Sequence, residues 1–149
     1  MAANFGHQFA NNGYISKLSA TNLTSIISPN AFINCCNLRE AYFPELISIQ
    51  SVSGFYDCSE LQHAEFPKLQ SIYQSEQLFS GDTNLVNLDF PMLTSIGNSD
   101  NVFRECTSLS SVGFPSLLEL SQNIGMFLGC SNLSSVEFPV LSSLDISTV

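Results

Sequence analysis

Two sets of side chains in the sequence have types and spacings that could do chemistry, and the first set is the cysteines. Cys35, Cys58, Cys106 and Cys130 each stand three residues after a phenylalanine. Thiolates bind zinc when they occur in paired C-x-x-C motifs, and that pairing is missing here. A total of five cysteines also argues against a fully paired disulfide scaffold. We therefore expect these four thiols to be buried, reduced and packed as small apolar groups.

Two residues depart from this cysteine series. Asp82 takes the cysteine position in one unit and interrupts the series, which argues against a series of disulfides between neighbouring units. Cys106 and Cys130 come from neighbouring units that could bring these two thiols within disulfide range. Cys36 falls outside the series, and we expect it to be the most reactive thiol.

The second set is Glu40, His63 and Glu65, whose carboxylates and imidazole could converge as metal ligands or as acid and base groups. The chain has only two histidines, no glycine-rich phosphate loop and no G-x-S-x-G motif. The sequence therefore predicts no catalytic residues, no metal site and no cofactor, and a protein that is not an enzyme.

All these residues belong to a repeat that the prolines mark. Five of the six prolines follow a phenylalanine, and from Pro44 onward they are spaced by 23, 24, 24 and 24 residues. A fixed period of this length indicates stacked supersecondary units. The pairs are Phe43-Pro44, Phe66-Pro67, Phe90-Pro91, Phe114-Pro115 and Phe138-Pro139.

Each unit reads L-x-x-[A/V/L]-x-F-P-x-L-x-x-[I/L] and continues to a second phenylalanine. The apolar positions before the proline alternate with period two, which predicts a half-buried strand that ends at the proline because proline has no N–H. Identical strands would stack about 4.8 Å apart in a parallel sheet. One coil cannot bury its own apolar residues, so we expect ladders of side chains that run from coil to coil. The second phenylalanines are Phe32, Phe55, Phe79, Phe103 and Phe127.

The first unit fits this pattern least well. Leu23 is assigned to the leading-leucine column and Ser28-Pro29 to the Phe-Pro column, so this unit lacks the x-L-x-x-I arm. We therefore predict an N-terminal cap or degenerate repeat at residues 1–22 and a solenoid of five to six coils at residues 23–149, with the last coil incomplete.

Composition limits the partners. Thirteen acids against four bases give a net charge of −9, which would repel nucleic acid and anionic lipid heads. No segment approaches the 18 or so apolar residues that a membrane helix needs, and residues 1–8 show no signal-peptide pattern. We expect no nucleic-acid partner and no membrane insertion.

With these columns, the unit followed by F-x-x-C-x-x-L resembles the BspA-like class of leucine-rich repeats over residues 23–144. The resemblance implies a curved right-handed coil with a parallel sheet on its concave face and loops or short turns on the convex side. It also implies a surface protein of bacteria or protozoan parasites that mediates adhesion or host-protein binding. A cell-surface or secreted location follows from the resemblance, whereas the missing signal leaves an intracellular location open.

The outward strand positions form the predicted concave face. Its centre is Tyr42, Glu65 and Asp89, with His63 beside them, and like charges one strand apart would favour a basic partner or a cation. The binding residues that we predict on this face are Tyr42, Glu65, Asp89, Glu137, Glu40, His63 and Asn87. The same two columns also hold Ser25, Ile27, Ser111, Gly113 and Ser135.

Three interpretations of the chain stay open at this point. The first is an interaction or adhesion module that binds a protein or glycan through the concave face. The second is a structural unit that stacks through its open terminal coil as a homo-oligomer. The third is a solvated face whose charges only prevent aggregation.

Overall fold

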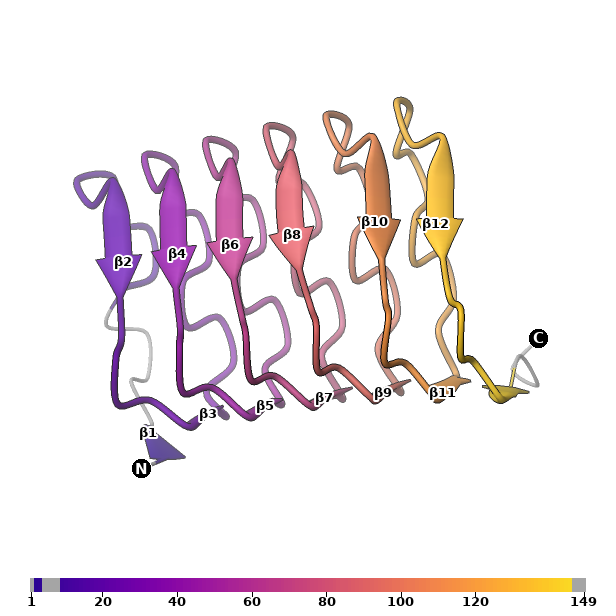
Figure 1. The fold of residues 1–149 in the computed structure, drawn as a ribbon. Helices are drawn as coiled ribbons and strands as arrows, with labels where there is room; N and C mark the ends of the chain where they lie inside the picture. The colour runs from indigo at the N-terminus through magenta and orange to yellow at the C-terminus, as the bar shows by residue number, and fades with distance from the viewer. Residues whose placement is uncertain (1, 4–8, 146–149) are drawn as a thin grey trace.

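The protein is a solenoid of parallel strands in a computed structural model that describes residues 2–3 and 9–145 (Figure 1). No helix occurs in that part of the chain. The even-numbered strands are β2 (Lys17–Ser19), β4 (Glu40–Tyr42), β6 (His63–Glu65), β8 (Asn87–Asp89), β10 (Ser111–Gly113) and β12 (Ser135–Glu137). The odd-numbered strands are β1 (Ala2–Ala3), β3 (Ser25–Ile26), β5 (Ser48–Ile49), β7 (Ser71–Tyr73), β9 (Ser95–Gly97), β11 (Glu119–Ser121) and β13 (Ser143–Asp145).

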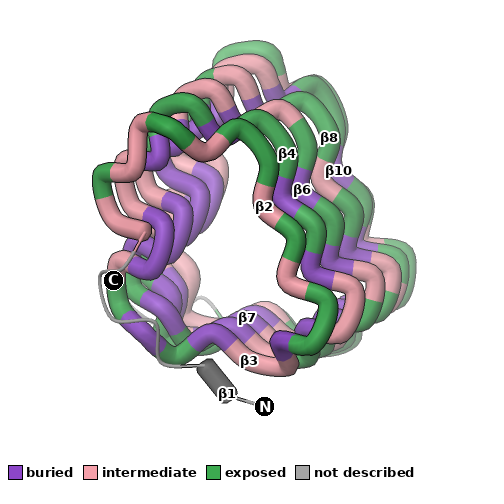
Figure 2. The backbone as a smooth tube through the Cα atoms, turned by 90° about the vertical axis from the view of Figure 1, so that its left-hand side faces the viewer, coloured by how far each residue is buried: buried purple, intermediate pink, exposed green. Residues whose placement is uncertain are grey.

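The strands form two faces of the coil. The odd-numbered strands make a seven-stranded sheet in the order β1-β3-β5-β7-β9-β11-β13. The even-numbered strands make a four-stranded sheet, β2-β4-β6-β8, and a separate pair, β10-β12. The end-on view places the even strands and the odd strands on different sides of one closed coil (Figure 2). The predicted parallel solenoid is confirmed, and the odd-numbered sheet is a second sheet that the sequence pattern did not predict.

Two columns of phenylalanine rings fill the coil. Phe43, Phe66 and Phe90 stack with centroids 5.6 and 5.7 Å apart, and the series continues through Phe114 and Phe138. The second column stacks at 4.9 to 5.6 Å and includes Phe9 at its start. Edge contacts between the two columns join them into one core. The predicted ladders are therefore confirmed, and Phe9 extends one of them into the first coil.

The cysteine column completes this core. The thiols of Cys35, Cys58, Cys106 and Cys130 hydrogen-bond the carbonyl oxygens of Phe9, Phe32, Phe79 and Phe103, at 2.9 to 3.1 Å. All five cysteines are free. The predicted burial is confirmed for Cys35, Cys58 and Cys106, whereas Cys130 is half-buried and Cys36 is exposed outside the column. Each thiol thus pairs a carbonyl of the preceding coil. Each thiol therefore contributes to the fold both as a small packed group and as a weak hydrogen-bond donor to a backbone carbonyl.

The register predicted for the first unit is wrong. Lys17–Ser19 pairs with Glu40–Tyr42, whereas Ser25–Ile26 pairs with Ser48–Ile49 in the odd-numbered sheet. Leu23 therefore belongs with Leu46, and the first coil has the arm that the pattern seemed to lack. Ser25 and Ile27 consequently lie off the face of the even-numbered strands. The pattern failed because Ala20-Thr21 stands where later coils have Phe-Pro.

The proposed division at residue 22 stays a prediction, although β2 within residues 1–22 already pairs with β4. The expected absence of a signal pattern rests on residues 1–8, of which 1 and 4–8 lie outside the described residues. Residues 146–149, at the end of the coil that was predicted to be incomplete, also lie outside them. Phe127, Leu133 and Phe138 near that end are half-buried, whereas their counterparts in earlier coils are buried. Stacking of a second copy there stays a prediction.

Asp82 is the exception in the cysteine column and is completely buried. Its Oδ1 accepts a hydrogen bond from the Cys58 N–H at 2.8 Å, and its Oδ2 has no hydrogen-bond partner within the described part of the chain. Burial raises the pKa of this carboxyl well above its usual value; the Cys58 N–H opposes the rise and the Asp57 carboxylate adds to it. The carboxyl is thus held in its protonated form well above the pH at which an exposed aspartate ionises.

Replacing Phe103 by alanine tests the stacking. Phe103 contacts rings on both sides in its own column and Phe90 and Phe114 in the other. Phe103→Ala should lower the free energy of unfolding by about 3 to 5 kcal/mol because a cavity opens in mid-stack. Chemical denaturation measures the change, with exposed Leu118→Ala as the control that should stay near the wild type. Equal effects of the two substitutions would contradict the proposed core.

Asp82 should make stability depend on pH. Unfolded aspartate has a pKa of about 3.9, so above that pH the unfolded chain loses a proton that the folded chain keeps. Stability should therefore fall as pH rises toward the folded pKa, by at most about 1.4 kcal/mol per pH unit. Asp82→Cys restores the thiol column and should remove this component. Urea unfolding of both proteins between about pH 5 and about pH 8 measures it, and parallel pH profiles would refute it.

Candidate binding surface

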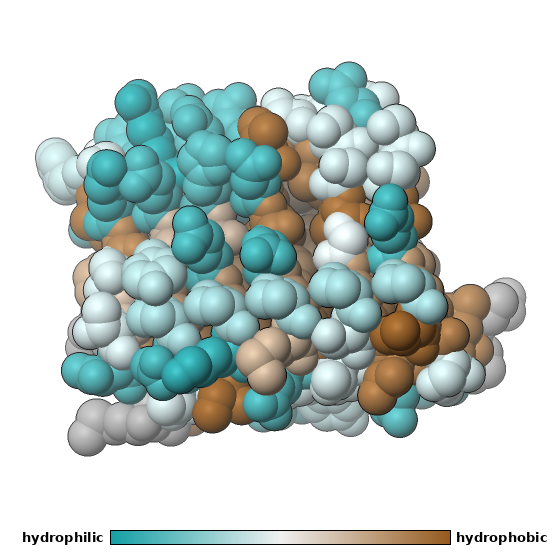
Figure 3. Space-filling view, in the orientation of Figure 1, coloured by the Kyte–Doolittle hydropathy of each residue, from teal (hydrophilic) through white to brown (hydrophobic). Residues whose placement is uncertain are grey.

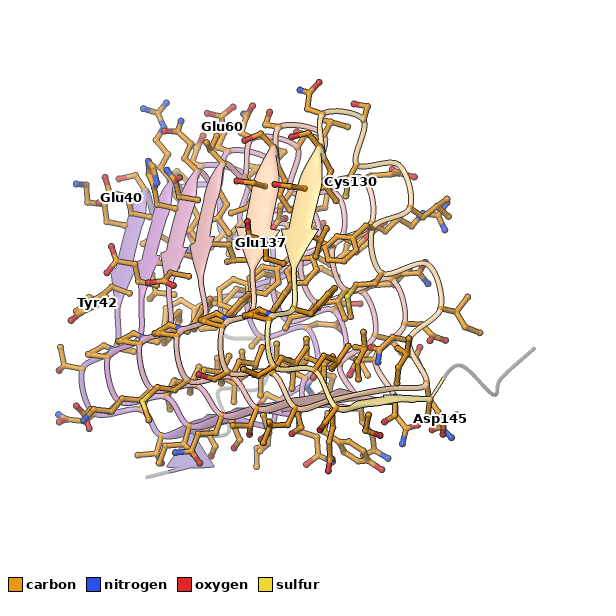
Figure 4. All side chains as sticks on the ribbon, turned by 45° about the vertical axis from the view of Figure 1, so that its right-hand side comes forward. Glu40, Tyr42, Glu60, Cys130, Glu137 and Asp145 are labelled. Atoms are coloured by element: carbon orange, nitrogen blue, oxygen red, sulfur yellow. The ribbon has the colours of Figure 1, made fainter. Side chains whose placement is uncertain are left out.

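The outward side chains of β2, β4, β6, β8, β10 and β12 form one surface, which we call the even-strand face. Burial alternates along these strands: in β4 and β6 the central Ala41 and Ala64 are buried and the residues on either side are exposed. This alternation follows from the pleat of a strand. The face corresponds to the predicted concave face, and Figure 4 shows Glu40 and Tyr42 projecting from it.

The sheet register brings six of the seven predicted residues together. Glu40 pairs with His63 and His63 with Asn87, while Tyr42 pairs with Glu65 and Glu65 with Asp89. The expected stacking of Tyr42, Glu65 and Asp89 on successive strands is confirmed. The seventh residue, Glu137, lies on β12, next to Gly113 of β10 and outside the four-stranded sheet.

Polar contacts fix one of the two columns. Asn87 Nδ2 lies 2.9 Å from His63 Nδ1, so the amide and the imidazole are within hydrogen-bond distance of each other. Lys17 Nζ lies 2.9 Å from Glu40 Oε2 at the other end of this column. Sequence reasoning missed Lys17 because the first coil was placed in the wrong register.

Glu65 and Asp89 form an acidic pair without compensation. All four basic residues of the chain are used elsewhere, since Lys17, Arg39, Lys68 and Arg104 lie within 4.0 Å of Glu40, Glu60, Glu45 and Glu105, respectively. Like charges on directly paired strand positions destabilise a sheet. A positively charged group placed over Glu65 and Asp89 would relieve this repulsion.

A break in the sheet lies beside this acidic pair. β8 is not paired with β10, and the break coincides with Leu88, a larger residue at the inward position that Ala41 and Ala64 take in β4 and β6. A hollow of about 580 Å³ spans the break and is bordered by Glu65, Asp89 and Gly113. Figure 3 shows hydrophilic side chains over the strands before the break and smaller, paler ones after it.

Gly113 keeps this hollow open. A Cβ at this position would meet no atom within 4 Å, and the backbone does not need glycine, because its φ lies outside the left-handed range. A smaller hollow of about 190 Å³ lies between Tyr42, Glu40, His63 and Glu65. The two hollows give the even-strand face a relief that a flat row of side chains lacks, and no motif in the sequence predicted them.

The even-strand face offers carboxylates, an imidazole, an amide and an exposed phenol. Within residues 2–3 and 9–145, no group of three His, Cys, Asp or Glu residues is arranged to hold a metal ion. No helix in the same ranges is long and apolar enough to cross a membrane.

Solved structures share this fold. A leucine-rich cell surface protein from Faecalibacterium prausnitzii matches 89% of the chain with a TM-score of 0.69 and 21% identity. A leucine-rich repeat protein from T. pallidum matches 77% of the chain with a TM-score of 0.60 and 24% identity. The chain covers 36% and 63% of these two proteins, so it spans less than two thirds of either one. At these identities the likeness establishes the fold alone.

A comparison with curated protein sequences gives no match. The family described as the BspA type leucine-rich repeat region matches residues 6–134, with six copies of its repeat. This match begins ahead of β2, in agreement with the register that places the first coil before Leu23. The chain belongs to the BspA-type leucine-rich repeat family.

Proposed function

We propose that this chain is a non-enzymatic interaction module that binds a protein or glycan ligand through the even-strand face. The observation that carries the proposal is the hollow of about 580 Å³ beside Glu65 and Asp89. A ligand there would enter a break in the sheet and meet two carboxylates that no base of the chain neutralises. Charge complementarity of this kind favours a ligand with a basic or cationic group and would speed its association.

Tyr42 extends the proposed surface. Its side chain is 42% exposed and stands directly before Glu65 in the register. Aromatic residues with a polar end are enriched at the centres of binding sites, because they combine apolar area with a hydrogen-bonding group. His63 and Asn87 support the surface through their mutual hydrogen bond, so the polar centre is ordered before a ligand arrives.

We further propose that the chain acts at a cell surface or in a secreted form as an adhesion module. The support is the family to which it belongs and the description of the Faecalibacterium prausnitzii neighbour as a cell surface protein.

Substitutions on the even-strand face test the binding proposal. The purified protein is applied to an array of glycans and extracellular proteins, and its variants are then measured on whatever it binds. Tyr42→Ser, Glu65→Gln and Asp89→Asn together should weaken binding at least about tenfold, because they remove the aromatic contact and both charges. Gly113→Arg should do the same by filling the hollow without a backbone clash.

The control for these variants is Asp57→Asn with Glu119→Gln, which removes two exposed acids away from this face. It should bind like the wild type. All variants should stay folded and unfold in one cooperative denaturant transition, since every changed side chain is exposed. Full binding by both the triple variant and Gly113→Arg would refute the proposed surface.

Protease treatment of intact cells tests the location. Peptides of this chain should be released from intact cells and identified by mass spectrometry. Protection of the chain until the cells are lysed would contradict a surface location and direct the ligand search to the cell interior.

A further inference from the structure

A second and larger groove runs along the solenoid on another side of the coil. It has a volume of about 800 Å³ and follows the corner where the chain leaves the odd-numbered strands. In the end-on view this corner lies at the lower left, away from β2, β4, β6 and β8 (Figure 2). None of its lining residues belongs to the even-strand face.

A recurring tripeptide with a buried centre builds this groove. In Gln50-Ser51-Val52, Gln74-Ser75-Glu76 and Asn98-Ser99-Asp100, the serine is buried and the residues on either side line the groove. The Ser51 and Ser75 N–H groups donate to the hydroxyls of Ser75 and Ser99, each at 3.1 Å. The serines therefore form a hydrogen-bonded floor that links each coil to the next. The residues before the serines line one side of the groove, which we call the first wall, and the residues after them line the other side, the second wall. Ile27-Ser28-Pro29 and Gln122-Asn123-Ile124 continue the walls at either end.

The first wall is a row of side-chain amides. Gln50 Nε2 donates to Gln74 Oε1 at 2.7 Å, and Asn98 Nδ2 donates to the Tyr73 hydroxyl at 2.7 Å. Among residues 2–3 and 9–145, the Gln50 oxygen, the Gln74 NH₂ group and the Gln122 side-chain amide have no further hydrogen-bond partner. A row that offers both donors and acceptors is complementary to the N–H and C=O groups of a peptide backbone.

The second wall changes from apolar to acidic and back to apolar. Glu76 and Asp100 stand at equivalent positions in adjacent coils, and none of the four bases reaches either of them. Asp100 Oδ1 accepts a hydrogen bond from the Ile124 N–H at 2.7 Å, which orients its carboxylate. Exposed apolar side chains flank the pair in this wall, with Val52 before it and Ile124 after it, while Ile27 stands in the column of the amide row.

We propose that this groove binds an extended peptide segment with basic residues at its centre and an apolar residue at each end. The basic side chains would meet Glu76 and Asp100, the backbone would meet the amide row, and the apolar ends would cover Val52 and Ile124. Five coils contribute to the groove, and four steps of about 4.8 Å span about 19 Å, the length of about six extended residues. A neutral glycan would leave both carboxylates without a partner and has no use for the apolar ends.

A synthetic peptide tests this proposal. The probe is a capped, fluorescently labelled heptapeptide with leucine at both ends and two lysines, in which one glycine separates each of these residues from the next, because alternate side chains of an extended peptide point to the same side. Fluorescence anisotropy of the wild-type protein should show saturable binding below about 1 mM, and the affinity should fall as salt is raised. A peptide with glutamate in place of both lysines should not bind.

Two matched double variants locate the site. Glu76→Gln with Asp100→Asn should lower the affinity for the lysine peptide at least about tenfold. The asparagine at position 100 keeps an oxygen that can accept the hydrogen bond from the Ile124 N–H. Glu65→Gln with Asp89→Asn removes the same charge from the even-strand face and should leave the peptide affinity unchanged. Val52→Ser should lower the affinity for the peptide with leucine ends and should leave the affinity for a peptide with glycine ends unchanged.

Three results would overturn the proposal. The first is no binding by the wild type up to about 1 mM peptide. The second is an equal loss in both double variants, which would mean that the peptide senses only net charge. The third is tight binding of a neutral oligosaccharide in this groove that persists in Glu76→Gln with Asp100→Asn. Because the groove and the even-strand face share no residue, none of these results bears on the function proposed above.

Discussion

No coil of this chain has a core of its own, and the contact between one coil and the next is the constraint on which the rest of the structure depends. The Phe43 ring packs on Phe66 at an interplanar angle of 5°, and the Phe79 ring packs on Phe103 at 4°. Such stacks form only if each coil returns the same side chain to the same place. The period of 23 to 24 residues is therefore a requirement of packing, and the outward columns are free to vary because they take no part in it.

The same constraint explains the small polar groups inside the coil. A backbone that turns within a packed interior leaves carbonyl and N–H groups that must find partners. The thiol of Cys58 reaches the Phe32 carbonyl, and the hydroxyl of Ser51 reaches the Ser28 carbonyl at 2.6 Å. Both donors are small enough to leave the ring stacks intact. Asp82 is larger, one of its oxygens has no hydrogen-bond partner in the described part of the chain, and burial of the carboxyl raises its pKa.

The sequence predicted those features that recur in every coil. The alternation around Ala41 and Ala64 was enough to place Tyr42, Glu65 and Asp89 on adjacent strands, because register in a solenoid follows from the period alone. The register of the first coil could not be predicted in this way. Ala20-Thr21 stands there in place of the Phe-Pro pair, and Asn12 stands in place of the cysteine, so both markers of the later coils are missing. The odd-numbered strands lie in the x-L-x-x-[I/L] arm after the proline, where the apolar residues are three apart and show no period-two alternation. The break between β8 and β10 and the serine-floored groove depend on distances between coils, and no pattern within one coil contains that information.

The distribution of charge argues that the two hollows are not accidental features of an acidic chain. The chain can place opposite charges one coil apart, as Lys17 with Glu40 and Lys68 with Glu45 show at 2.9 and 2.7 Å. At Glu65 with Asp89 and at Glu76 with Asp100 it places like charges one coil apart, and both pairs border a hollow. Each solvated pair costs on the order of 1 kcal/mol or less, which a continuous core can bear. Alternating signs would have removed that cost and also the field that attracts a basic ligand, which is the electrostatic argument for the ligands proposed at both hollows.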